Sequence, residues 1–171
     1  MPPRGATDGP TGPLEERARE VREAFAGRYR EYQYRFVEFL TEHLSDLSRA
    51  FGGDLQAMLV LAVIGQVRIA SMAYAGTDGN QEEQGAITAS RLADVTGIPR
   101  ETVRRKLTLL ANKGWIERTP GRSWRLVVRE EEAAARQDLS ELDQRAIQRI
   151  ARLFAGLEVL VPSAERPGKR P

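Results

Sequence analysis

The sequence contains no cysteine and one histidine, His43, among its 171 residues. Without thiols the chain can form no disulfide, no thiolate metal site and no cysteine nucleophile. A single histidine also excludes a metal centre built from several histidines. Because the sequence has no nucleophile–base pair and no glycine-rich phosphate loop either, we expect no catalytic residue, no metal and no cofactor. An enzyme is the least favoured class of function.

Long hydrophobic runs are lacking as well. The longest strongly apolar run, AMLVLAVIG at 57–65, is far shorter than the ~20 residues that span a bilayer. The opening MPPRGATDGPTGP has no apolar core of the kind found in secretory signals. We therefore expect a cytoplasmic protein with no membrane partner. Proline, glycine and polar residues predict disordered tails at 1–13 and 162–171 and a flexible loop at 76–85.

Net positive charge is concentrated in one part of the chain. Residues 86–129 carry ten basic and three acidic side chains, a net charge of +7, whereas the rest of the chain carries 16 basic and 21 acidic side chains, a net charge of −5. A basic segment inside an acidic chain is typical of a module that faces a polyanion. The alternative is chance clustering on a solvated surface.

Helical periodicity dominates the segments on both sides of this basic region. Apolar residues recur every three or four positions from Val21 to Phe51 and again from Leu139 to Leu157. Gly27 is expected to kink or split the first of these helices. Between them, a helix at 54–74 is apolar nearly all round and is expected in the middle of a core. We assign 14–75 to N-terminal helices, 86–129 to the basic module and 130–161 to a C-terminal helix.

The basic module reads as two short helices joined by a sharp turn. Thr88 is a good N-cap for the first helix, and Gly97 can supply the positive φ that ends it. The second helix is predicted at 100–113. At ~100° per residue, its buried stripe is Val103, Leu107 and Leu110, so the opposite face is basic and polar in its first two turns.

A hairpin is predicted after the second helix, within 115–128. Strand-forming residues lie on both sides of TPGR, and Pro120-Gly121 suits the centre of a type II turn. Two helices and a basic hairpin in this order are the parts of a winged helix-turn-helix, in which a recognition helix enters the major groove of DNA and the hairpin contacts the adjoining backbone. The expected fold class is mainly α with a small β-hairpin wing, flanked by long dimerisation helices.

The run ITASRLADVTGIPRETVRRKLTLLANKGWIERTPGR resembles the winged-helix domains of bacterial transcription regulators. Its recognition helix is similar to that of GntR-type regulators, and the long helices on both sides are similar to the layout of MarR-type regulators, which dimerise through such helices. The resemblance implies a homodimer on double-stranded DNA, with repression as the default mode. It also implies that the following residues touch DNA: Thr88, Ser90, Arg100, Glu101, Thr102, Arg104, Arg105, Arg118 and Arg122.

Several alternatives stay open at this stage. Glu101 either accepts a hydrogen bond from a cytosine amino group or only complements the helix dipole. The long helices either form a dimer or close a monomeric core. An aromatic group (Phe25, Tyr29, Tyr32, Tyr34 and Phe36) either lines a pocket for an unidentified small-molecule effector or belongs to the core or dimer interface. The competing function is a winged helix that binds another protein and has no DNA target.

Overall fold

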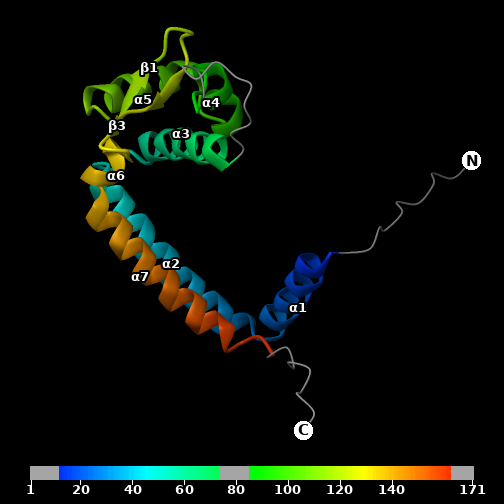
Figure 1. Ribbon diagram of the computed structural model, residues 1–171. Helices are drawn as coiled ribbons and strands as arrows, with labels where there is room; N and C mark the ends of the chain where they lie inside the picture. Colours follow the sequence, from blue (N-terminus) through cyan, green and yellow to red (C-terminus); the bar gives the residue numbers. More distant parts are fainter. Residues whose placement is uncertain (1–11, 74–84, 163–171) are drawn as a thin grey trace, which may run out of the picture. The chain divides into compact units, whose positions relative to one another are not determined.

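The computed structural model describes residues 12–73 and 85–162, which are mainly helical with two small antiparallel hairpins (Figure 1). The mainly helical class predicted from the sequence is confirmed. The predicted tails and the loop at 76–85 lie almost wholly outside the described residues, although Pro13 already begins a helix. The elements are α1 (Pro13–Gly27), α2 (Tyr29–Ala50), α3 (Leu55–Ala73), α4 (Ala89–Thr96), α5 (Arg100–Asn112), β1 (Ile116–Arg118), β2 (Trp124–Leu126), β3 (Val128–Arg129), β4 (Glu132–Ala133), α6 (Ala134–Asp138) and α7 (Ser140–Glu158).

The chain divides into two compact units. Unit 1 comprises Met1–Glu42 and Ile147–Pro171, and unit 2 comprises His43–Ala146. The long first helix expected from the sequence is split, because α1 ends at Gly27 and α2 begins at Tyr29. Helices α2 and α7 each begin in one unit and end in the other.

The hydrophobic core lies in unit 2, where α3 packs against α4, α5 and β2. One side of α3 is buried there, as expected for a core helix: Ala57, Val60, Leu61, Val63 and Ile64. The expectation that α3 is buried all round is wrong, because Leu59, Ile69 and Met72 on its other side are exposed. Helix α3 is long and apolar enough to cross a membrane, but a core helix passes the same test of length and composition.

The two helices of the basic module form as predicted. The Thr88 side chain caps α4 by accepting a hydrogen bond from the Arg91 amide at 3.2 Å. Gly97 ends α4 with a left-handed φ of 69°, a conformation that costs a glycine nothing. Ile98 is buried in the angle between the helices, and α5 then begins at Arg100.

The first hairpin pairs β1 with β2, with Arg118 opposite Trp124. The type II turn predicted at Pro120-Gly121 is wrong, because the left-handed φ of the turn falls on Arg122 (66°). The Arg122 amide donates to the Thr119 carbonyl at 3.0 Å, and the Thr119 amide donates to the Ser123 carbonyl at 2.9 Å. These bonds close a three-residue loop, in which the third residue takes the left-handed conformation.

A second hairpin, which the sequence did not reveal, joins β3 to β4. Its two-residue turn is Glu130-Glu131, with φ of 50° and 70°. Two consecutive positive φ values define a type I′ turn, which is normally built from Asn and Gly. Glutamates at both positions are strained by about 1 kcal/mol or more each.

Trp115 links three parts of unit 2. Its indole Nε1–H donates to the Asp138 carboxylate of α6 at 2.7 Å. The ring also meets Phe51 edge-on, with centroids 5.8 Å apart, and carries the Lys113 ammonium 4.7 Å from its centre. The side chain is buried and belongs to the hydrophobic core.

We expect the strain in the second turn to be measurable. The double variant Glu130→Asn/Glu131→Gly should raise the free energy of unfolding by about 1–2 kcal/mol, because both residues tolerate the left-handed conformation better than glutamate does. Urea unfolding followed by tryptophan fluorescence measures the change. The control Glu130→Gln/Glu131→Gln removes the same charges and should change little. An equal gain in the control would show that charge repulsion, and not the backbone, destabilises the turn.

Candidate nucleic-acid interface

The orientation of α5 is fixed by a buried stripe and one ion pair. Val103, Leu107 and Leu110 are at most 1% exposed, as predicted from the helical wheel. At the edge of this stripe, the Lys106 ammonium lies 2.7 Å from the carboxylate of Asp54, just before α3. The Asp54 carboxylate also accepts the Ala57 amide at 3.0 Å, so it caps α3 and holds α5 at the same time.

The charge state of Asp54 follows from these contacts. Burial raises its pKa, but the hydrogen bonds from Lys106 and the Ala57 amide and the positive charges of Lys106 and Arg105 outweigh that effect. The pKa of Asp54 therefore lies below its ordinary value of 3.8. Since Lys106 is occupied in this pair, it is not available to DNA.

The opposite face of α5 presents basic side chains to solvent. Arg100, Arg104 and Arg105 are all exposed, whereas Thr102 is half-buried. The Arg104 guanidinium forms an exposed ion pair with Glu101 at 3.4 Å, one turn away on the same helix. Such exposed pairs contribute little free energy, so Arg104 can exchange Glu101 for another anion at low cost.

The start of α4 and the first hairpin are joined directly. Ile87 and Trp124 exchange two backbone hydrogen bonds of 2.9 and 2.8 Å, which form an isolated antiparallel bridge. Thr88 and Ser90 follow this bridge and are exposed. The bridge therefore holds the first turn of α4, with its hydroxyls, beside the hairpin.

The hairpin carries three arginines with different surroundings. Arg125 is held by Glu117 of the neighbouring strand, with Nε 2.8 Å from the carboxylate. Arg118 and Arg122 are exposed at and near the tip. Within residues 12–73 and 85–162, no ion pair or hydrogen bond engages the side chains of Arg118 and Arg122, and the same holds for Arg100 and Arg105 of α5.

All nine residues predicted to touch DNA lie in unit 2, on α4, α5 and the first hairpin. Sequence reasoning missed the residues that anchor this surface from behind, Asp54 and Asp138. Both are acids far along the chain from their basic-module partners, so no local pattern indicates them. No group of three or more potential metal ligands is found among the described residues.

Comparisons of the chain with models of known protein families, with curated proteins and with solved structures found no match.

The ion pair behind α5 should control stability and its dependence on pH. Asp54→Asn keeps the cap on α3 but removes the charge facing Lys106, and should lower the free energy of unfolding at pH 7 by about 1–2 kcal/mol. Because the pKa of Asp54 is lowered on folding, its ionic contribution is present above about pH 4 and is lost as the pH falls further.

Urea unfolding of the native protein and Asp54→Asn between pH 7 and pH 3 measures this difference. The gap in free energy between the two proteins should narrow below about pH 4, where the native carboxylate becomes protonated. A gap that stays constant to pH 3 would show that the charge of Asp54 does not stabilise the fold.

Proposed function

We propose that the protein is a sequence-specific, double-stranded-DNA-binding transcription regulator of the winged helix-turn-helix type. The observation that carries the proposal is the outer face of α5, where Arg104 and Arg105 are exposed on the side away from a fully buried stripe. Arg104 has only an exposed ion pair with Glu101, and Arg105 has no carboxylate partner among the described residues. A planar guanidinium fits both guanine edges and phosphate oxygens. In this proposal α5 is the recognition helix and enters the major groove.

In the proposed complex, the first turn of α4 and the first hairpin contact DNA on either side of the recognition helix. The exposed first turn of α4 offers hydroxyls from Thr88 and Ser90 to a phosphate. The first hairpin acts as the wing, with Arg118 and Arg122 toward the DNA backbone or minor groove. In this role Glu101 serves as the counter-charge of Arg104 in the free protein, a role that its 3.4 Å ion pair supports more directly than a base contact.

We further propose that the protein binds DNA as a homodimer. Two recognition helices related by a two-fold axis would read a palindromic site whose halves lie roughly 34–36 Å apart. Repression by occupying a promoter is the expected mode, by resemblance to winged-helix regulators. An unidentified small-molecule effector remains a candidate partner.

The decisive experiment is selection from random double-stranded DNA, followed by binding measurements over a range of salt concentrations. The native protein should enrich a palindromic sequence. Arg104→Ala/Arg105→Ala should weaken binding to it by roughly 1–3 kcal/mol per lost base contact, or lower the salt slope by about 0.9 per lost phosphate contact.

A matched variant separates local contacts from general electrostatics. Lys113→Ala/Arg129→Ala removes two positive charges near the C-terminal end of α5, one from the residue that follows the helix and one from β3, and should have a much smaller effect. If the selection returns no sequence, and a protein partner binds native and Arg104→Ala/Arg105→Ala equally well, the module is a protein-binding winged helix and the proposal is wrong.

The wing offers an independent test, because its tip arginine is in a strained conformation. Replacing Arg122 with glycine relieves the left-handed φ of 66° and should raise the free energy of unfolding by roughly 0.5–1 kcal/mol. The same Arg122→Gly change should weaken DNA binding and lower the salt slope by about 1. Urea unfolding and DNA titration of the one variant measure both effects. Unchanged DNA binding in the stabilised variant would remove Arg122 from the interface.

A further inference from the structure

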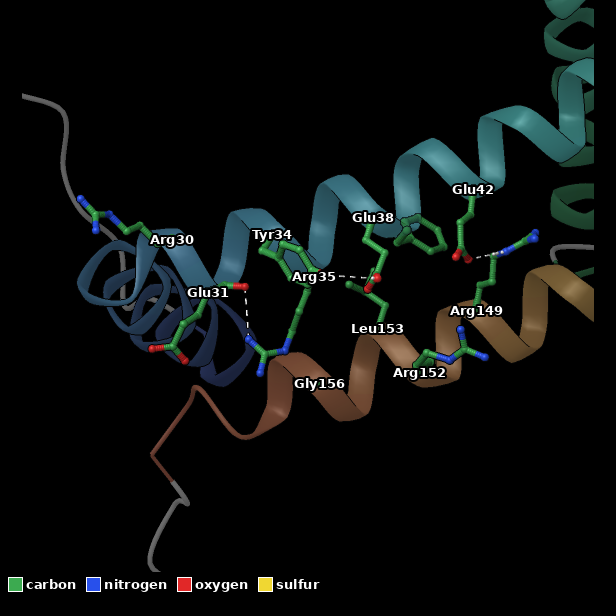
Figure 2. Close-up of a pocket in the computed structure, with 11 residues that line it drawn as sticks. Arg30, Glu31, Tyr34, Arg35, Glu38, Glu42, Arg149, Arg152, Leu153 and Gly156 are labelled. Carbon is green, nitrogen blue, oxygen red and sulfur yellow. Dashed lines mark hydrogen bonds and ion pairs between the residues drawn. The ribbon is translucent and has the colours of Figure 1, made fainter.

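A hollow of about 450 Å³ lies between α2 and α7 in unit 1 (Figure 2). The two helices are antiparallel there. Glu42 of α2 pairs with Arg149 of α7 at 3.0 Å, whereas Arg35, two turns earlier on α2, lies against Gly156, two turns later on α7. The volume is within the range of roughly 300–1,000 Å³ that is usual for sites that hold small molecules.

The floor of the hollow is apolar. Phe39 of α2 and Leu153 of α7 are both half-buried there. Gly156 lets the Arg35 side chain cross from α2 to α7, because a β-carbon at this position would lie 3.0 Å from Arg35 Cδ. The Arg35 guanidinium donates to the Glu31 carbonyl at 3.2 Å, which holds it at one end of the floor.

The two walls carry opposite charges that do not pair with each other. On the α2 side, the exposed Glu38 side chain points toward α7 (Figure 2), and its carboxylate accepts a long hydrogen bond of 3.5 Å from the Tyr34 hydroxyl. On the α7 side, Arg152 is exposed. Within residues 12–73 and 85–162, no ion pair engages Glu38, and neither an ion pair nor a hydrogen bond engages the Arg152 side chain. The hollow therefore offers a free carboxylate and a free guanidinium on either side of an apolar floor.

The charges of the whole lining limit what can bind. Four arginines and three glutamates line the hollow, and Glu42 and Arg149 neutralise each other. A polyanion would meet several carboxylates, and a polycation would meet several guanidinium groups, and such like-charge contacts are costly. A zwitterion with an apolar body avoids both, because each of its charged groups can approach the wall of opposite charge.

We propose that this hollow binds an α-amino acid with a large apolar side chain. The ammonium group pairs with Glu38 beside the Tyr34 ring, whose π face also attracts cations. The carboxylate pairs with Arg152, and the apolar side chain covers Phe39 and Leu153. The proposal gives a chemical class to the small-molecule partner considered above. It uses no residue of α5 or of the first hairpin, so it does not depend on DNA binding.

The aromatic residues singled out in the sequence are divided between two surfaces. Tyr34 lines the hollow, whereas Phe25, Tyr29 and Tyr32 line a separate groove between α1 and α2. Phe25 stacks on Tyr32 with centroids 4.9 Å apart, and Tyr32 stacks on Phe36 at 5.9 Å. Tyr34 is therefore the aromatic residue of this group that the proposed site uses.

Isothermal titration calorimetry of the full chain with L-phenylalanine and two analogues tests the proposal. The analogue 3-phenylpropanoate lacks the ammonium group and 2-phenylethylamine lacks the carboxylate, but both keep the aromatic body. L-Phenylalanine should bind about tenfold more tightly than either, because each analogue loses one charged hydrogen bond. Glycine should also bind more weakly, because it has no side chain to cover the floor. If neither L-phenylalanine nor L-leucine binds, or if an analogue binds as tightly as L-phenylalanine, the proposal is wrong.

Single-charge variants assign each ligand group to its residue. Glu38→Gln should bind L-phenylalanine no more tightly than 3-phenylpropanoate, because the ammonium group has lost its partner. Arg152→Gln should bind L-phenylalanine no more tightly than 2-phenylethylamine, for the corresponding reason. The controls Glu158→Gln on α7 and Arg22→Gln on α1 remove the same charges from exposed positions outside the hollow, and should keep the native preferences.

Both wall residues are exposed, so these variants should unfold in urea at the same midpoint as the native protein. A variant of Glu38 or Arg152 that folds normally and still discriminates between the ligands as the native protein does would overturn the assignment. None of these titrations contains DNA. A chain that binds L-phenylalanine as described but selects no DNA sequence would contradict the proposed function and leave this proposal intact.

Discussion

The ion pair between Lys106 and Asp54 is the interaction on which the outer surface of unit 2 depends. The buried stripe of Val103, Leu107 and Leu110 turns one face of α5 toward the core. A short charged hydrogen bond of 2.7 Å at the edge of that stripe adds a directional constraint on the rotation of the helix about its axis. Since the same carboxylate caps α3, the start of the core helix and the direction of Arg104 and Arg105 are set by one side chain.

The helix-turn-helix part of the chain could be predicted because its signals are local. The cap at Thr88, the left-handed residue at Gly97 and the buried stripe of α5 each depend on residues within a few positions of one another. What could not be predicted depends on distant partners. Lys106 and Asp54 are 52 positions apart, and Trp115 and Asp138 are 23 apart. No periodicity in the sequence links such pairs.

Turn chemistry explains the remaining errors in the fold. The sequence placed the left-handed residue of the first hairpin at Gly121 because glycine adopts that conformation freely, but the hydrogen bonds of Thr119 set a loop in which Arg122 has to adopt it. The second hairpin was missed because Glu130-Glu131 is an unfavourable pair for a type I′ turn. At both turns the pairing of the adjoining strands, and not the preference of the turn residues, sets the backbone conformation, and both turns carry exposed charged side chains.

The limits of sequence periodicity explain why the long helices could be predicted but their contacts could not. It identifies which face of a helix is apolar, but it does not say which face meets another part of the same chain. Between α2 and α7, half-buried Phe39 and Leu153 lie beside the ion pair of Glu42 and Arg149. Neighbouring apolar side chains of α7, Ile147 and Phe154, are exposed. An amphipathic pattern thus does not say which of the apolar residues of a helix are covered within the same chain.

The contacts of Trp115 connect the C-terminal end of α5 to α6 and to the end of α2. Its indole N–H is buried and has its hydrogen bond to Asp138, so withdrawing α6 leaves a donor without an acceptor, at a cost of about 1–3 kcal/mol. The same ring is in contact with Phe51, which directly follows α2. A displacement at the end of α2 or at α6 therefore acts on the Trp115 side chain, which lies just after the C-terminal end of α5. Because Trp115 is part of the hydrophobic core, such a displacement also acts on the core residues packed around it.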